Sequence, residues 1–131
     1  MDVGAPSNFV RILEIFDNKF VDLKNKVNAV SVSDSATAAT MLKVHADHGY
    51  TLDPHGAVGF WALSEYLETH PGQEGIVMET AHPVKFDSVN EILKTEIPIP
   101  AAVGELVSKQ EFSIEMANDY NVLRDVLISK I

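Results

Sequence analysis

The sequence predicts an α/β fold, a partial three-layer sandwich in which short, mostly parallel strands are flanked by helices. Two observations lead to this class. Apolar runs of strand length alternate with segments of helical periodicity along the 131 residues, and no internal repeat interrupts that order. Only two or three strands are visible, and a parallel strand needs both faces covered. We therefore expect residues 1–131 to be one segment that completes a larger domain.

The first helix is predicted over residues 7–17, where Ser7 can cap the free backbone N–H groups. Residues 20–23 either continue this helix or begin a second short one. The apolar face that defines the pattern is formed by Phe9, Val10, Ile12, Leu13 and Phe16.

A strand and a second long helix are predicted next. The alternation of small apolar and polar residues over 29–33 favours a short strand. Asp34 or Ser35 then caps a helix that runs to Gly49. Residues 50–52 are short enough to form either a strand or an extended arm.

The clearest helix start in the chain is Asp53-Pro54, because Asp is a favoured cap and Pro suits the first helical position. This helix is expected to run to His70 and to end before Pro71-Gly72. The apolar run over 75–79 follows a turn and reads as a buried strand.

The remaining elements are helical. Residues 86–93 and 101–107 are predicted as short helices on either side of an extended linker at 97–100, where two prolines disfavour helix. A last helix begins at Met116 or Asn118 and runs to Ile128.

Charge and composition narrow the function classes. The chain has 19 acidic and 10 basic residues and a net charge of -9, so nucleic acid and anionic membranes are not expected partners. The absence of cysteine excludes a disulfide framework and thiol catalysis. With no signal-peptide pattern and no apolar run of bilayer length, we expect a cytoplasmic protein.

Three loops are candidate sites. Thr80 ends the predicted strand at 75–79, where ligands bind in open α/β sheets; alternatively it caps the following turn. His55 follows the cap Asp53 at a helix start that suits anions; alternatively Asp53 only caps and His55 is solvated. Ser7 and Asn8 open the first helix and suit a phosphate or carboxylate; alternatively they only cap it.

Other chemistries are weakly supported. His45 and His48 have a spacing that can hold zinc, but a third ligand is missing, so no metal site is predicted. The glycine-rich dinucleotide and phosphate loops and the nucleophilic serine elbow are absent from the sequence. No pair of carboxylates stands out as an acid/base couple.

Three segments together resemble the carboxyl-terminal third of the threonine synthase family: MDVGAPSNF (residues 1–9), YTLDPHGAVG (50–59) and ETAHPVKF (79–86). VSVSD at 30–34 is also similar. The departures are mild, with Ala5 and Gly56 at positions where the family often has other residues, Thr at the latter.

The resemblance implies a pyridoxal-phosphate enzyme of the tryptophan-synthase β-type fold that converts O-phosphohomoserine and water to threonine and phosphate. It places Thr80 at the pyridine nitrogen of the cofactor and Ser7, Asn8, Asp53 and His55 along the active-site cleft. The chain would then belong to the larger pyridoxal-phosphate-binding domain.

The family's Schiff-base lysine and glycine-rich phosphate loop have no counterpart in this sequence. The lysines that lack the matching context are Lys19, Lys24, Lys26, Lys43, Lys85, Lys94, Lys109 and Lys130. We therefore expect a carboxyl-terminal fragment that is inactive alone, binds no cofactor alone, has the rest of the parent enzyme as its partner, and self-associates when isolated.

Two alternatives remain open. In the first, the parent enzyme is a threonine synthase-like phospholyase, which eliminates phosphate without forming threonine. In the second, the chain is a free-standing interaction module without enzymatic activity. The three motifs do not separate the phospholyase from the synthase, and the incomplete predicted sheet argues against the free-standing module.

Overall fold

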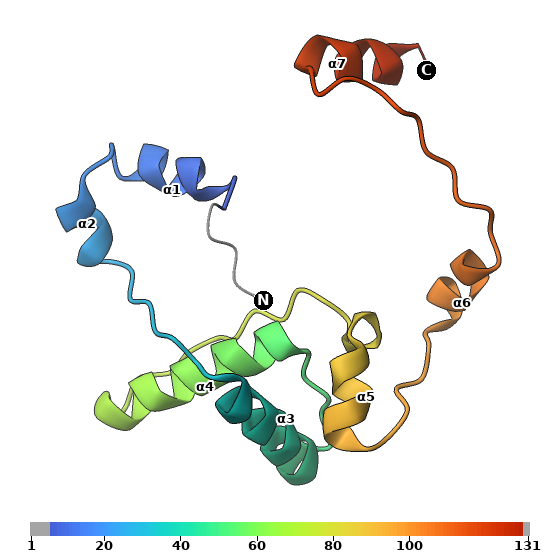
Figure 1. Ribbon diagram of the computed structural model, residues 1–131. Coiled ribbons are helices and arrows are strands. Elements are labelled where there is room, and N and C mark those ends of the chain that lie inside the picture. The colour runs from blue at the N-terminus through green and yellow to red at the C-terminus, as the bar shows by residue number, and fades with distance from the viewer. Residues whose placement is uncertain (1–5, 130–131) are drawn as a thin grey trace. The chain divides into compact units, whose positions relative to one another are not determined.

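The computed structural model describes residues 6–129, and within these residues all regular structure is helical. Figure 1 shows the order of the helices along the chain. They are α1 (Phe9–Ile15), α2 (Phe20–Lys24), α3 (Asp34–His48), α4 (Pro54–Thr69), the 3-10 helix η1 (Pro83–Lys85), α5 (Asp87–Leu93), α6 (Ala101–Val107) and α7 (Tyr120–Ile128).

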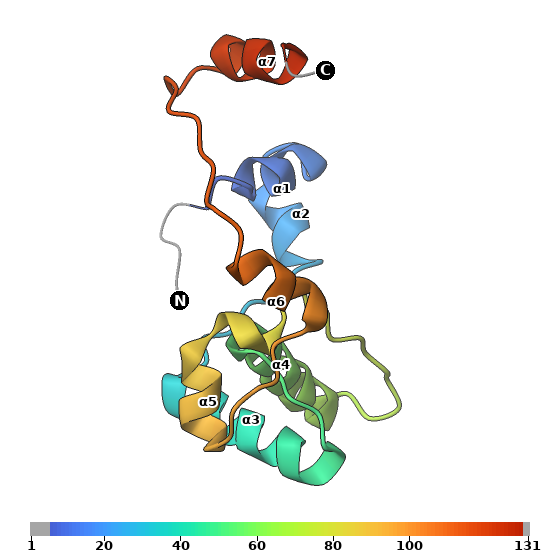
Figure 2. The ribbon, with the colours of Figure 1, turned by 90° about the vertical axis from the view of Figure 1, so that its right-hand side faces the viewer.

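The chain divides into two units, Met1–Ile97 and Pro98–Ile131. In the first, α3 packs against both α4 and α5, as Figures 1 and 2 show from two directions. The core of this unit is small. Its buried apolar residues are Met41, Val44, Leu52, Ala57 and Val89, with Phe60, Phe86, Ile92, Leu93 and Ile97 packed around them.

One face of α3 carries this core because its residues recur at helical spacing. Met41 and Val44 are buried, and so are Thr37 and Thr40 on the same face. The two threonine hydroxyls donate to backbone carbonyls one turn earlier, at 2.9 and 2.8 Å. Their polar atoms are therefore satisfied inside the core.

The ends of α3 and α4 are set by local chemistry. Ser33 Oγ accepts a bond from the Ala36 amide at 3.2 Å, and α3 stops where Gly49 adopts a left-handed φ of 64°. Asp53 caps α4, and Pro54 takes its first position. The second unit holds α6 and α7, whose cap Asp119 accepts bonds from the Asn121 and Val122 amides.

The predicted α/β sandwich is wrong for the part of the chain that the structure describes, since residues 6–129 contain no strand. Residues 75–79 are extended, but they lie along α4: a side chain at Gly75 would meet Leu63, and Val77 lies beside Gly59. In the described chain, the backbone of 74–81 and of 29–33 makes no ladder hydrogen bond. Extended segments become strands only by pairing, and these two do not pair with each other.

The helix predictions are mostly confirmed, with shifted ends. The helix expected at 7–17 ends at Ile15, because Asp17 and Asn18 have left-handed φ values of 50° and 56°, and α2 starts separately. Ser7 does not cap α1; Asn8 precedes it and makes no side-chain capping bond.

Further helix starts differ from the prediction. Ser33 caps α3 in place of Asp34 or Ser35, and α7 begins at Tyr120. Residues 50–52 form the extended arm rather than a strand. No helix among the described residues is long and apolar enough to cross a membrane.

Candidate functional site

Four side chains gather where α4 begins: Tyr50, Asp53, His55 and Glu79, here called the α4-start cluster. The backbone amide of Asp53 donates to Glu79 Oε1 at 2.7 Å, so residues 26 positions apart in sequence are joined directly. This bond brings the predicted loop at 53–55 and the predicted site at Thr80 to one place in the fold. The structure thus unites two of the three loops that the sequence singled out.

Asp53 is fully buried, with no exposed surface. Its Oδ1 accepts the backbone N–H of His55 at 2.8 Å and lies 2.9 Å from His55 Nδ1. Because an ionised carboxylate only accepts, the imidazole is the donor in this contact. Oδ2 of Asp53 has no partner within residues 6–129. A buried acceptor without a donor is uncommon and marks a group whose partner matters.

His55 is held on its other side by an aromatic ring. Its ring centroid lies 5.2 Å from that of Phe86, with the planes at 61°, an edge-to-face arrangement. The side chain is 47% exposed, so the imidazole is fixed by Asp53 and Phe86 yet open to a ligand. Asp53 itself is buried, caps α4 and holds the His55 side chain in place.

Glu79 fits against α4 because residue 56 is glycine. A Cβ at Gly56 would lie 2.8 Å from Cδ and Oε2 of Glu79, closer than non-bonded atoms approach. Burial raises the pKa of Glu79 above its usual value; the bond from the Asp53 amide opposes this, and the Asp53 carboxyl raises it further. The negative charge of Glu79 in turn raises the pKa of the Tyr50 hydroxyl.

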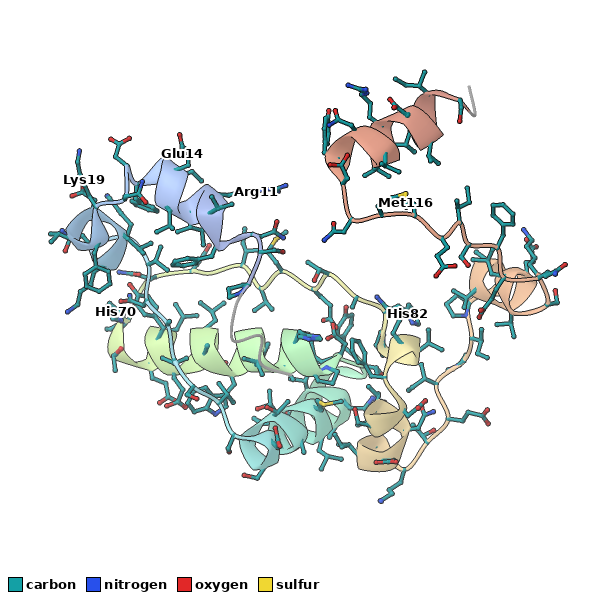
Figure 3. All side chains as sticks on the ribbon, turned by 45° about the horizontal axis from the view of Figure 1, so that its top comes forward. Arg11, Glu14, Lys19, His70, His82 and Met116 are labelled. Atoms are coloured by element: carbon teal, nitrogen blue, oxygen red, sulfur yellow. The ribbon has the colours of Figure 1, made fainter. Side chains whose placement is uncertain are left out.

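Thr80 follows Glu79 directly and is exposed, and its hydroxyl makes no hydrogen bond to any described residue. The alternative that Thr80 caps the next turn is wrong, because His82 caps η1: its Nδ1 accepts the Val84 amide at 3.2 Å. Figure 3 labels His82 just before that turn. The Thr80 hydroxyl is therefore available to a ligand.

A hollow of about 410 Å³ adjoins the cluster on one side. Its walls are mainly apolar, with the polar groups of His48, Tyr50 and Glu79 at its rim. The lining residues are Val44, His48, Tyr50, Leu52, Phe60, Val77 and Glu79. A mainly apolar hollow with a few polar groups has the composition of a ligand or partner site.

The other candidate residues lie apart from the cluster. Ser7 and Asn8 are exposed before α1, and their side chains make no hydrogen bond to it in the part of the chain described here. Residues 1–5 of the first motif, and Lys130, lie outside the described residues. His45 Nδ1 contacts Thr51 Oγ1 at 3.3 Å, and residues 6–129 hold no cluster of three metal-ligating side chains.

Sequence reasoning missed Glu79 and Tyr50. Glu79 is the last residue of the apolar run at 75–79, and the prediction counted it as part of that strand and not as a site residue. One signal was available: Val77 and Glu79 share a period-two face, and both are half-buried, whereas Ile76 and Met78 are exposed. A carboxylate on the inward face of an apolar run needs a partner, which marks it as a candidate.

Comparisons with known proteins agree across the chain. The family model described as "Threonine synthase, C-terminal" matches residues 56–127, more than half of the chain. The threonine synthase of Escherichia coli is 35% identical over 130 residues, covering 98% of this chain and 29% of that protein. That of Haemophilus influenzae is 36% identical over 129 residues, with the same coverage.

Two solved structures are similar in fold. The crystal structure of threonine synthase from Escherichia coli matches 100% of this chain and 30% of that chain, with a TM-score of 0.71 and 34% identity. The PLP-bound threonine synthase from Brucella melitensis matches 97% of this chain and 32% of that chain, with a TM-score of 0.57 and 26% identity. This chain therefore spans about 30% of the length of the relatives it matches.

Proposed function

Since this chain belongs to the threonine synthase C-terminal family, we propose that it acts as part of a threonine synthase. The reaction we assign to that enzyme is the conversion of O-phosphohomoserine and water to threonine and phosphate. The observation that carries the proposal is the match over 98% of the chain to threonine synthases at about 35% identity. The family resemblance predicted from the three motifs is confirmed at this level.

Pyridoxal phosphate is the proposed cofactor of the whole enzyme, and one solved relative is described as PLP-bound. When bound, this cofactor supplies an electron sink for substrate carbanions. Thr80 is the residue we assign to its ring nitrogen. The assignment fits the structure, because the Thr80 hydroxyl has no partner among the described residues and its neighbour Glu79 is anchored. A neutral hydroxyl leaves the ring nitrogen free of an imposed proton.

We propose cleft-lining roles for His55, Asp53, Ser7 and Asn8. The support is strongest for His55, which is half-exposed and held in place by Asp53 and Phe86. Asp53 is buried, so its part is to orient His55 and to start α4. None of the lysines has the context of the Schiff-base lysine, and we expect the chain alone to be inactive and cofactor-free. We place the enzyme in the cytoplasm, which the absence of cysteine fits.

The proposed partner is the rest of the enzyme. The extended backbone of 75–79 has free ladder positions within the described chain, and Ile76 and Met78 beside it are 86% and 77% exposed. Open backbone next to exposed apolar side chains suits pairing with another strand and coverage by another layer. The strand that the sequence predicted at 75–79 would then form only on assembly.

A chimera tests the proposal. The matching C-terminal 30% of Escherichia coli threonine synthase is replaced by this chain, and the product is tested in a strain that requires threonine. We expect growth without threonine, a pyridoxal absorbance band, and equal release of phosphate and threonine. A folded chimera without the band would refute the proposal. Phosphate released with 2-oxobutyrate in place of threonine would establish the phospholyase alternative.

Thr80→Val in the same chimera tests the site, with Thr80→Ser as the matched control. Loss of one hydrogen bond of about 0.5–1.5 kcal/mol predicts a rate lower by about two- to tenfold for Thr80→Val. Thr80→Ser keeps the hydroxyl and should keep the rate. Equal rates in the two variants would remove Thr80 from the site.

A further inference from the structure

The carboxyl of Glu79 accepts the backbone N–H of Asp53 at 2.7 Å, so the carboxyl groups of Asp53 and Glu79 are neighbours at the start of α4. We propose that Glu79 is a positioning residue that shares a proton with the buried carboxylate of Asp53. The shared proton ties the segment carrying Thr80 to the first turn of α4. The tie is a property of this chain alone, and only its consequence for the cofactor rests on the proposed function.

The hydrogen bonds of Asp53 require a further donor. Oδ1 is occupied by the amide and imidazole of His55, whereas Oδ2 has no partner within residues 6–129. Asp53 has no exposed surface, so bulk water does not supply the missing bond. Leaving a buried acceptor unpaired costs free energy that a nearby donor recovers. The neighbouring group that can carry a proton is the carboxyl of Glu79, which already bonds to the Asp53 amide.

The bonds of Glu79 fix which of its atoms can carry the proton. Oε1 accepts the backbone N–H of Asp53 at 2.7 Å, and an oxygen that accepts this bond keeps it whether the carboxyl is ionised or neutral. The proton is therefore assigned to Oε2, from which it donates to Asp53 Oδ2. The pair makes two parallel bonds: Asp53 N–H to Glu79 Oε1, and Glu79 Oε2–H to Asp53 Oδ2. Without the proton, two negative oxygens would face each other and Oδ2 would stay unpaired.

The other groups near the pair act in both directions. Tyr50 lowers the pKa of Glu79 and so opposes its protonation, His55 bonds to Asp53, and His48 lines the adjoining hollow. The N-terminus of α4 favours a single negative charge nearby, which the pair with one proton supplies. Burial acts in the same direction and raises the pKa of Glu79.

The pair also gives a reason for the glycine at position 56. The carboxyl of Glu79 occupies the space that a Cβ there would fill, with Cδ and Oε2 at 2.8 Å from that point. Glu79 is thus held against the helix backbone from one side and by Asp53 from the other. The backbone of the next residue, Thr80, is therefore held in a fixed position. When the proton is lost at higher pH, the carboxylates of Glu79 and Asp53 repel each other, and the backbone of Thr80 is no longer held in place.

The proton has a definite effect on stability. Because folding raises the pKa of Glu79, the protonated carboxyl adds to the free energy of unfolding. This contribution is fully present below pH 4.5, the ordinary pKa of the group. It is lost as the pH rises through the folded value. Glu79→Gln is the matched variant: the glutamine oxygen accepts the Asp53 amide, and its NH₂ donates to Oδ2, as protonated Glu79 does. Its stability should show no loss over this pH range.

The experiment is a pH titration of the chain with ¹³C-carboxyl-labelled glutamate, in which Glu79→Gln identifies the Glu79 signal. We expect the pKa of Glu79 to lie above 4.5, the ordinary value of a glutamate carboxyl. We expect its pKa to fall by about one unit or more in Asp53→Asn, because the asparagine NH₂ then donates to ionised Glu79. Asn caps as well as Asp, so α4 should persist.

Two results would overturn the shared proton: a Glu79 pKa at or below the ordinary 4.5 in the unaltered chain, or an unchanged Glu79 pKa in a folded Asp53→Asn. If Asp53→Asn does not fold, the titration of the unaltered chain and the pH dependence of Glu79→Gln decide the question. An ordinary titration of Glu79 would leave the pyridoxal band of the chimera unaffected. A failed chimera would likewise leave the titration unaffected, so the two proposals fail separately.

Discussion

Met41 is one of the largest fully buried side chains among residues 6–129. It is 1% exposed and lies on the α3 face that packs against α4 and α5, within the apolar core of the first unit. Truncating a buried Met to Ala removes apolar contacts and leaves a cavity, at a cost of about 2–5 kcal/mol. A small domain has only about 5–15 kcal/mol in total. Met41→Ala should therefore remove a large share of the stability of this unit.

Leu42→Ala is the matched control, since it is the adjacent residue of the same helix and is 48% exposed. Both changes end in alanine, so the intrinsic helix propensity changes little in either. The half-exposed leucine has less burial to lose, and we expect a cost of at most about 1 kcal/mol. The difference between the two variants then measures the core itself.

The assay is urea unfolding of both variants and of the unaltered chain. Helix content is followed by circular dichroism, and the first unit is followed by the fluorescence of Trp61, the one tryptophan of the chain, which is half-buried in α4. A loss below about 1 kcal/mol in Met41→Ala would refute the packing of α3 against α4 and α5. Equal losses in the two variants would refute it as well.

Two further predictions test local features. Gly49→Ala should lower the free energy of unfolding by about 1–2 kcal/mol, because φ there is 64°, and Gly49→Asn should cost less in the same urea experiment; equal stability of all three chains would exclude a left-handed end of α3. The isolated chain should self-associate by light scattering, and Ile76→Lys with Met78→Lys should reduce the association, because both side chains are exposed beside open backbone; a stable monomer before substitution would contradict this.

The helices were predictable because their signals are local. Asp53-Pro54 predicted the start of α4 to the residue, since the cap bond spans only two positions and the proline fixes its own φ. The limits of α6 were also predicted to the residue. Errors arose where neighbouring residues could serve equally: Ser33, Asp34 and Ser35 are all capping types, and only the backbone conformation selects Ser33.

The strands could not be predicted in the same way, because a strand is defined by its partner. Residues 75–79 have the alternation of a strand, with Ile76 and Met78 exposed and Val77 half-buried. The described chain supplies α4 to cover one face but no neighbouring strand to pair with the backbone. The predicted buried strand is therefore wrong for residues 6–129, which contain no strand and in which Ile76 and Met78 are exposed.

In the candidate site too, the residues marked by short sequence patterns were predicted, whereas the contact between residues far apart in the sequence was not. Asp53 and His55 were found from a capping pattern, and Thr80 from its place after an apolar run. The link between them is a bond from Asp53 to Glu79, across 26 positions, which no local pattern reports. The role of Glu79 depends on the space above Gly56 and on the unpaired Oδ2 of Asp53.

Glu79 also explains why two short motifs of the family resemblance occur together. DPHG at 53–56 supplies the amide, the buried carboxylate and the missing side chain that Glu79 needs, and ETAH at 79–82 supplies Glu79 with Thr80 beside it. Each motif is incomplete alone: the first leaves a buried acceptor unpaired, and the second leaves a half-buried carboxyl without a partner. Where a relative has Thr in place of Gly56, the added Cβ must displace the Glu79 carboxyl, because 2.8 Å is too short for both. The position of Thr80 and the residue at 56 are therefore physically coupled through Glu79.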